Sequence, residues 1–215
     1  MRKYLLHVCF PVLFALIISF VFIAIPITSA TGGSITLRSH YRSLSSSQVQ
    51  SMPNVFIQDT LGWGFIGYST INHDYNPEII RGGVVVIDNA TGLMWHQSGS
   101  DNEMSWYEAK EWVQELNEGS WENRGGYAGY QDWRLPTVEE AASLLESSEK
   151  YVGLSIDPVF SRKQIVFWTG DRGAGGKYGP EIVWIVNVCA DRGRVVGINN
   201  RSNDRHYVRP VRSMK

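Results

Sequence analysis

Basic side chains gather near the C-terminus, and they are the first candidates for a chemical role. They are Arg192, Arg194, Arg201, Arg205, Arg209, Arg212 and Lys215. Only one acid, Asp204, lies among them. If several of these cations share one face of the folded chain, they would attract an anionic glycan or surface polymer. The alternative is that Arg209 and Arg212 pair with acids on the helices, which would leave the other cations solvated.

A glycine-rich segment precedes this basic run and has the composition of an exposed loop. It spans residues 170–180, and we predict that a ligand contacts it together with residues 192–205. The candidate ligand-binding residues are Asp171, Arg172, Lys177, Tyr178, Arg192, Arg194, Asn199, Asn200, Arg201 and Asp204. Oxygen donors here could also hold calcium, although Asn and Asp in loops more often form turns. These donors are Asp171, Asp191, Asn199, Asn200, Asn203 and Asp204. No other cofactor is predicted.

Familiar catalytic patterns do not accompany these segments. The histidines beyond the N-terminal apolar run lack the spacing of zinc ligands. They are His40, His73, His96 and His206. The sequence has no G-x-S-x-G elbow, and the glycines at 173–176 lack the Lys-Ser/Thr ending of a phosphate loop. We therefore predict a protein that is not an enzyme.

The first thirty residues have the pattern of a targeting segment. Arg2 and Lys3 precede an apolar run over residues 5–27, and small residues follow at 28–30. This pattern predicts a secretory signal, but about 20 apolar residues would also serve as an uncleaved anchor in the inner membrane. In both cases we expect the rest of the chain to be exported, to the periplasm or beyond the cell.

Charge gives no reason to expect a nucleic acid partner. The chain carries 20 basic and 21 acidic residues. Loss of Arg2 and Lys3 with the targeting segment would leave a net charge of about −3. An exported, weakly acidic chain argues against nucleic acid.

The remaining sequence divides into a linker and one domain. Residues 31–53 are rich in Ser and are expected to form a linker, with a short helix over 45–52. The domain is predicted over residues 54–215.

The elements of this domain predict an α+β fold. Capping boxes precede two apolar stripes, at Ser105 with Glu108 and at Thr137 with Glu140, so we predict two amphipathic helices. Runs rich in β-branched or aromatic residues predict strands. These runs span residues 84–87, 93–95, 165–169, 182–189, 194–198 and 207–211. We expect the helices to pack on a twisted antiparallel sheet with long irregular loops.

Residues 132–137, Asp-Trp-Arg-Leu-Pro-Thr, have a structural interpretation of their own. Trp133 can anchor the sheet, while Arg134 can satisfy buried carbonyls or pair with a carboxylate such as Asp132 or Asp88. Pro136 and Thr137 then begin the second helix. We assign structural roles to Asp88, Thr91, Gly92, Trp95, Trp106, Asp132, Trp133, Arg134, Pro136, Thr137, Arg209 and Arg212.

An ordered set of blocks resembles the Lcl C-terminal domain family. The blocks span residues 88–95, 105–109, 132–140, 156–160, 167–169 and 207–212. The resemblance covers roughly residues 81–212 and implies a C-type-lectin-like α+β fold, distantly similar to the formylglycine-generating enzymes. Those enzymes depend on a pair of cysteines that hold copper. Here only Cys189 would remain after export, so that chemistry is not available to a single chain.

Three functions remain in view. The first is an exported, non-enzymatic binding or adhesion module for glycans or anionic envelope polymers. The second is a membrane-tethered envelope protein whose domain docks onto another protein, with the linker as a spacer. The third is an enzyme of uncertain type.

Overall fold

The computed structural model describes most of the predicted domain and part of the predicted linker. The described residues are 34–60, 64–119, 125–150, 153–175, 179–189, 193–199 and 203–214. Residues 32–215 belong to one compact unit. The predicted targeting segment, residues 1–30, lies outside the described residues. Within the described ranges, no helix combines the length and the apolar character that a membrane crossing requires.

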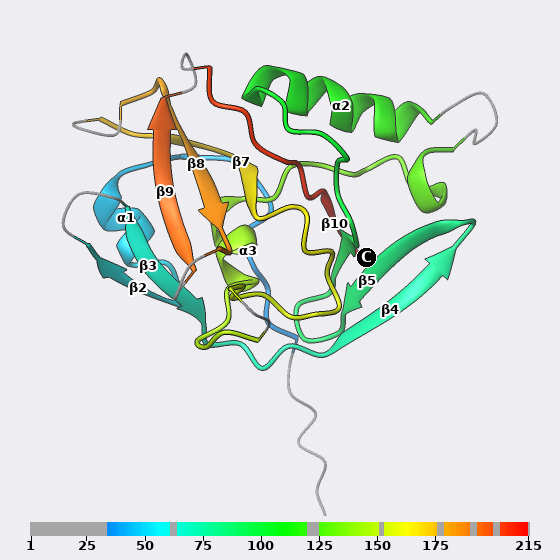
Figure 1. The fold of residues 1–215 in the computed structure, drawn as a ribbon, viewed down its shortest axis with the longest axis horizontal. Coiled ribbons are helices and arrows are strands. Elements are labelled where there is room, and N and C mark those ends of the chain that lie inside the picture. Colours follow the sequence, from blue (N-terminus) through cyan, green and yellow to red (C-terminus); the bar gives the residue numbers. More distant parts are fainter. Residues whose placement is uncertain are drawn as a thin grey trace, which may run out of the picture. The chain divides into compact units, whose positions relative to one another are not determined.

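Two sheets form the framework, which confirms the α+β class but replaces the expected single sheet (Figure 1). The six-stranded sheet has the order β1-β7-β8-β9-β3-β2, and the four-stranded sheet has the order β10-β6-β5-β4. The larger sheet consists of β1 (Ser43–Leu44), β2 (Val55–Asp59), β3 (Phe65–Ser69), β7 (Val166–Gly173), β8 (Ile182–Asn187) and β9 (Arg194–Asn199). The smaller consists of β4 (Tyr75–Ile80), β5 (Gly83–Asp88), β6 (Leu93–His96) and β10 (Val211–Ser213). The β1–β7 pair is parallel, and the other described strand pairs are antiparallel.

Two strand predictions need correction. The strand expected over residues 207–211 begins only at Val211, because the residues before it make single bridges to Met104 and Phe167. The edge strand β4 was not predicted, since Pro77 and polar residues interrupt its pattern.

Three α-helices and one 3₁₀ turn accompany the sheets in the described ranges. They are α1 (Ser46–Gln50), α2 (Trp106–Glu118), η1 (Tyr127–Gly129) and α3 (Val138–Ser143). Both predicted capping boxes are formed, at Ser105 ahead of α2 and at Thr137 ahead of α3. However, α3 is not amphipathic, because all six of its residues are buried. A helix surrounded on every side shows no polar stripe.

The predicted linker is wrong for residues 34–53, which are packed into the domain. Leu37, Leu44, Val49 and Met52 are buried and belong to the same apolar cluster as α3. The few apolar residues in this Ser-rich segment therefore supply core contacts. Its strand β1 also adds to the edge of the larger sheet beside β7.

Two apolar clusters fill the interior. One surrounds α3 and contains Phe160, Phe167 and Trp184. The other lies under α2, whose buried residues Trp106 and Ala109 meet side chains from both sheets. These contacts fix the orientation of α2, so the side of the helix opposite them is the exposed one.

Candidate functional site

The first turns of α2 place an indole and an ammonium group together. Ser105 accepts a hydrogen bond from the backbone N–H of Glu108, which fixes where the helix begins. Trp106 and Lys110 are then four residues apart and lie on one face. The indole N–H of Trp106 donates to the carbonyl of Thr169 at 2.8 Å, and Lys110 Nζ lies 4.1 Å from the indole centroid. The indole is held rigidly, with a cation on its face.

Strand β7 brings a second cation to the same indole. Its register against β8 shifts between Trp168 and Arg172, where a bulge interrupts regular pairing. Beyond the bulge, Arg172 Cζ lies 4.7 Å from the Trp106 centroid. Two positive side chains therefore lie against one aromatic ring.

The segment before β1 completes the site. Tyr41 packs directly on Gly170, where a Cβ atom would lie only 2.1 Å from the Tyr41 ring. The Tyr41 hydroxyl donates to the carbonyl of Leu135 at 3.0 Å, and burial raises its pKa to about 12. Gly170 is therefore needed for this close approach, and Tyr41 stays neutral at physiological pH.

The resulting cavity, the Trp106 pocket, is cationic. It has a volume of about 390 Å³ and is lined by Tyr41, Arg42, Ser43, Trp106, Lys110, Leu135, Gly170 and Arg172. No carboxylate lines it among the described residues. Burial lowers the pKa of Lys110, and the neighbouring charge of Arg172 lowers it further. The pocket holds positive charge that its own lining does not neutralise.

Asp171, predicted to contact ligand from an exposed loop, is instead fully buried in β7. Its carboxylate accepts two hydrogen bonds from the Arg38 guanidinium, at 2.9 and 2.7 Å. It also accepts from the backbone N–H groups of Arg42 and Val138, at 2.6 and 2.7 Å. The bulge turns Asp171 inward, where it connects the start of α3 to the predicted linker. These contacts occupy both carboxylate oxygens, so the role predicted for Asp171 as a ligand or calcium contact is wrong.

Of the other predicted contacts, Arg194 lies far along the sheet from Arg172, whereas Asn199, opposite Ile182 of β8, lies at the same end of the sheet as Arg172. Arg172 lies opposite Val183 of β8, whereas Arg194 lies opposite Asn187 at the other end of that strand. Asn199 ends β9, and Asp204 lies in the segment before β10. Arg172 is thus the predicted residue that the Trp106 pocket contains. Lys177, Tyr178, Arg192, Asn200 and Arg201 lie outside the described residues, as does Asp191.

Charge pairs in the 132–137 block differ from those predicted. Arg134 pairs with Glu140 of α3 through two hydrogen bonds, at 2.7 and 2.6 Å, rather than with Asp132 or Asp88. Asp132 pairs instead with Arg212, at 2.6 Å. Because Glu140 also accepts from the backbone N–H of Thr137, the Arg134 pair is part of the helix cap.

Backbone contacts hold the rest of the block in place. The Trp133 indole N–H donates to the carbonyl of Tyr127 at 2.9 Å. The side chain of Asn117 bonds both the N–H and the carbonyl of Trp133, each at 2.8 Å. The Thr137 hydroxyl donates to the carbonyl of Arg38 at 2.9 Å. These contacts agree with the structural role predicted for Trp133 and Thr137.

Arg209 is fully buried and does not pair with a helix acid, so that alternative is wrong. Its guanidinium donates to the carbonyls of Gln97 and Ser161, at 2.5 and 3.0 Å. It also lies against Phe160 and Phe167. A buried arginine that holds backbone carbonyls belongs to the framework.

A Ser-His-Asp arrangement that the sequence did not predict lies between β3 and β5. His73 Nδ1 is 2.7 Å from Asp88 and its Nε2 is 3.1 Å from the Ser69 hydroxyl. However, Nε2 also lies 2.7 Å from the carbonyl of Ser143, which can only accept. Nε2 must therefore carry a proton, so it cannot remove one from Ser69. Burial alone would raise the pKa of Asp88, but hydrogen bonds from His73 and Thr91 lower it. The arrangement joins the two sheets to α3.

Sequence reasoning missed several pocket residues, among them Tyr41, Arg42 and Lys110. Tyr41 and Arg42 were assigned to a linker, and only the fold brings them beside β7. Lys110 could have been found, because it lies four residues after Trp106 on a predicted helix. Among the described residues, no cluster of three or more His, Cys, Asp or Glu side chains is arranged to hold a metal ion.

Comparison with known proteins gives one match. The family model of the Lcl C-terminal domain matches residues 84–212. This range contains α2, α3 and all of β7, and therefore the wall of the Trp106 pocket formed by Trp106, Lys110 and Arg172. Neither the curated proteins nor the solved structures include a significant match.

Proposed function

Because the chain belongs to the Lcl C-terminal domain family, we propose that it is an exported, non-enzymatic binding module for an anionic glycan or another anionic surface polymer. The observation that carries this proposal is the uncompensated positive charge of the Trp106 pocket. The whole chain is close to neutral, with 20 basic and 21 acidic residues, so this charge is a local feature.

The geometry of the cations favours an anionic group on the ligand. Lys110 and Arg172 both lie within 5 Å of the Trp106 centroid, at 4.1 and 4.7 Å, so their charges repel each other. A carboxylate or sulfate between them would remove this repulsion and accept charge-assisted hydrogen bonds. The cost of holding the two cations together would be recovered when such a group binds.

The remaining surfaces of the pocket favour a sugar over a small inorganic anion. Tyr41, which is 46% exposed, supplies aromatic surface, and the volume of about 390 Å³ lies in the range of ligand sites, roughly 300–1,000 Å³. The aliphatic face of a sugar ring can pack on the Tyr41 ring while its acidic group meets the cations. An acidic sugar residue of a polymer would use both features.

Binding without catalysis is supported by the groups present in the pocket. Tyr41 has a pKa of about 12 and is not a base at neutral pH. The described lining contains no carboxylate or histidine that could transfer a proton. The pocket can therefore bind an acidic sugar, and apart from Lys110 its described lining offers no group suited to acid–base chemistry at neutral pH.

We also infer that the fold is C-type-lectin-like and that the domain is exported. The lectin-like assignment is supported by the family and by the combination of two sheets with few helices (Figure 1). Export is supported by the basic start, the apolar run and the small residues of positions 1–30.

The proposal can be tested by titrating the full chain with a uronic acid polysaccharide, at low and high salt. The same polymer with its carboxyl groups reduced to alcohols is the matched neutral probe. We expect binding to the acidic polymer that weakens as salt increases, and little binding to the reduced one. Arg172→Gln and Lys110→Gln should each lower the affinity about tenfold, the effect of one lost charge-assisted contact.

The control variant is Lys150→Gln, which makes the same change in net charge outside the pocket. Lys150 is 46% exposed and pairs with Glu146. Its substitution should leave the affinity nearly unchanged. An equal loss in Lys150→Gln, or equal binding of the reduced polymer, would overturn the proposal.

A further inference from the structure

We propose that a second cavity, the His96 pocket, binds an uncharged, hydroxyl-bearing ring such as a neutral hexopyranose residue. This cavity has a volume of about 570 Å³, and its lining includes His96, Asp101, Asn102, Trp112, Leu116 and Tyr127. It goes beyond the function proposed above, because the Trp106 pocket contains none of these residues.

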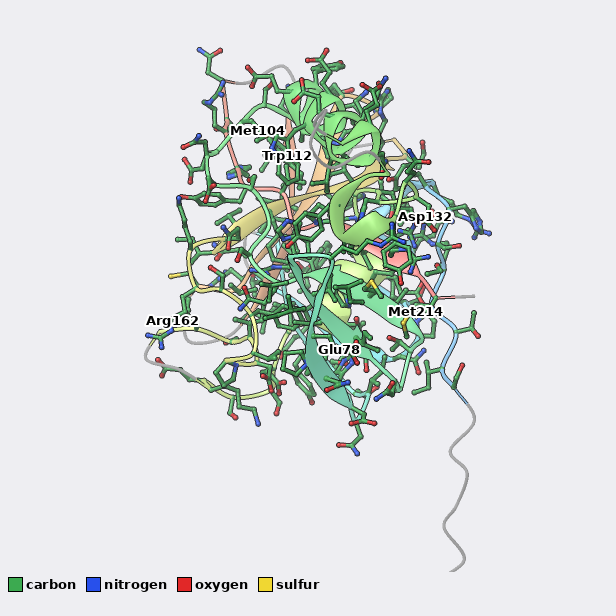
Figure 2. The ribbon with its side chains drawn as sticks, turned by 90° about the vertical axis from the view of Figure 1, so that its right-hand side faces the viewer. Glu78, Met104, Trp112, Asp132, Arg162 and Met214 are labelled. Atoms are coloured by element: carbon green, nitrogen blue, oxygen red, sulfur yellow. The ribbon has the colours of Figure 1, made fainter. Side chains whose placement is uncertain are left out.

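The two cavities lie on different faces of α2. Trp106 and Lys110 line the first, and Trp112 and Leu116, also four residues apart, line the second. An offset of six residues corresponds to a rotation of about 120° around a helix. Figure 2 shows Trp112 beside Met104, another residue of the His96 pocket, next to α2. Neither pocket therefore blocks the other.

The lining of the His96 pocket includes a hydrogen-bond donor that is available to a ligand. The backbone N–H of Gly99 donates to His96 Nδ1 at 2.9 Å, so in the neutral ring the proton is on Nε2. Burial, aided by the charge of Arg209, lowers the pKa of His96 to about 4, so the ring is neutral at physiological pH. No described residue accepts a hydrogen bond from Nε2, and Nε2 is not among the buried polar atoms that lack a partner, so solvent reaches it. A ligand that enters the pocket can supply this acceptor.

Backbone geometry holds the imidazole in this state. Gly99 has a φ of +73°, and a Cβ atom there would lie 2.1 Å from the carbonyl of Val208. Only glycine fits this turn, and the turn delivers the N–H that occupies Nδ1. One face of the His96 ring stacks on the Tyr127 ring, with the ring centroids 4.0 Å apart. The orientation of Nε2–H is therefore fixed before any ligand binds.

The other lining groups distinguish between ligand classes. Trp112 and Tyr127 offer aromatic surface for the C–H face of a sugar ring. Asp101 is the only charged side chain in the described lining; it is exposed and pairs with Lys163 at 3.7 Å. The lining itself therefore offers an anionic ligand no cation. A quaternary ammonium would suit the aromatic rings but would leave Nε2–H without an acceptor. A neutral sugar suits the aromatic rings, Asp101 and His96 together. Its C–H face packs on the rings, while its hydroxyls donate to Asp101 and accept from His96.

The test is a titration of the full chain with the methyl glycosides of glucose, galactose and mannose. Binding is followed by calorimetry and by the indole N–H resonance of Trp112, which the Trp112→Leu variant assigns. We expect at least one glycoside to bind with about millimolar affinity and to shift this resonance. Trp112→Leu and His96→Phe should each lower that affinity tenfold or more.

Controls separate this site from the Trp106 pocket. Lys110→Gln and Arg172→Gln should retain neutral glycoside affinity even if they abolish acidic polymer binding, so each proposal can fail alone. Circular dichroism identifies a variant that has unfolded, and Asn102→Ala, a change at the cavity lining, provides a second variant expected to weaken binding. The proposal is overturned if no glycoside binds. It is also overturned if tetramethylammonium shifts the Trp112 resonance and no glycoside does, or if Arg172→Gln abolishes neutral glycoside binding.

Discussion

Helices α2 and α3 begin with the same device but have different surroundings. Ser105 with Glu108 and Thr137 with Glu140 form equivalent capping boxes. Glu108 is exposed at the surface, whereas Glu140 is fully buried and bonded to Arg134. The local motif alone does not determine what the helix start does in the folded protein.

The polar groups around the two helices differ in the same way. Near α3, buried acids have cations and backbone N–H groups as partners, as Asp171 has with Arg38 and Val138. Near α2, Lys110 and Arg172 share an indole without a carboxylate in their pocket, and His96 keeps a donor without a described acceptor. Most framework charges have partners within the protein, although Arg209 Nε has none, while the pockets beside α2 hold polar groups that a ligand can contact. We therefore propose that the α2 region is the binding surface and that the α3 region is framework.

The largest expected difference in stability between the two regions follows from substitution of their capping glutamates, Glu140 and Glu108. Glu140→Gln should lower the free energy of unfolding by about 3 kcal/mol, because it leaves Arg134 largely buried without its carboxylate. Glu108→Gln should have a much smaller effect, since Glu108 is solvated. Urea unfolding of both variants, followed by circular dichroism, checks the difference. Similar losses in the two variants would mean that the helices do not differ as argued.

How much of this the sequence could predict depends on the range of the interactions. The helix starts were predicted, because a capping box is set by residues three positions apart. The partner of Arg134 was not, since Asp132, Asp88 and Glu140 are equally plausible acids until the chain is folded. The end of α3 at Ser143 is not evident from the sequence, because its apolar pattern continues through Leu144 and Leu145.

The candidate site was predicted only in part, for the same reason. Arg172 was identified from its charge in a glycine-rich segment, and it lines the Trp106 pocket. The register shift that turns Asp171 inward depends on pairing with β8, which residue types do not specify. Tyr41 and Arg42 reach the pocket through the pairing of β1 with β7, about 130 residues away in sequence.

The pH dependence of stability should single out His96 within the α2 region. Its pKa is about 4 in the folded protein, against the ordinary value of 6.5 expected for the unfolded chain, so the unfolded chain binds a proton that the folded chain excludes. Stability should therefore fall as the pH decreases from 6.5 to 4, by up to about 3 kcal/mol from this group. Arg209 and Asp101 act on His96 in opposite directions but are present in both proteins compared.

The measurement compares unfolding of the wild type and His96→Gln at several pH values between 4 and 7. Gln cannot be protonated, so the difference in unfolding free energy between the two proteins should change across this range. Parallel curves would show that His96 does not keep the low pKa on which its role as a neutral donor depends.

The smallest expected effect on stability is at Lys110. Its substitution distinguishes the two regions, because it should change binding and leave stability nearly unchanged. Lys110→Gln removes the repulsion from Arg172 and the nearby attraction of Glu111, so the free energy of unfolding should stay within about 0.5 kcal/mol of the wild type. The same variant is expected to bind the acidic polymer about tenfold more weakly. Loss of charge would thus cost stability at Glu140 and affinity at Lys110.

A decrease in stability of more than about 1 kcal/mol in Lys110→Gln would place Lys110 in the framework, because surface substitutions away from structural contacts have smaller effects. The weaker binding would then follow from a disturbed helix, and the distinction between α2 and α3 would no longer hold.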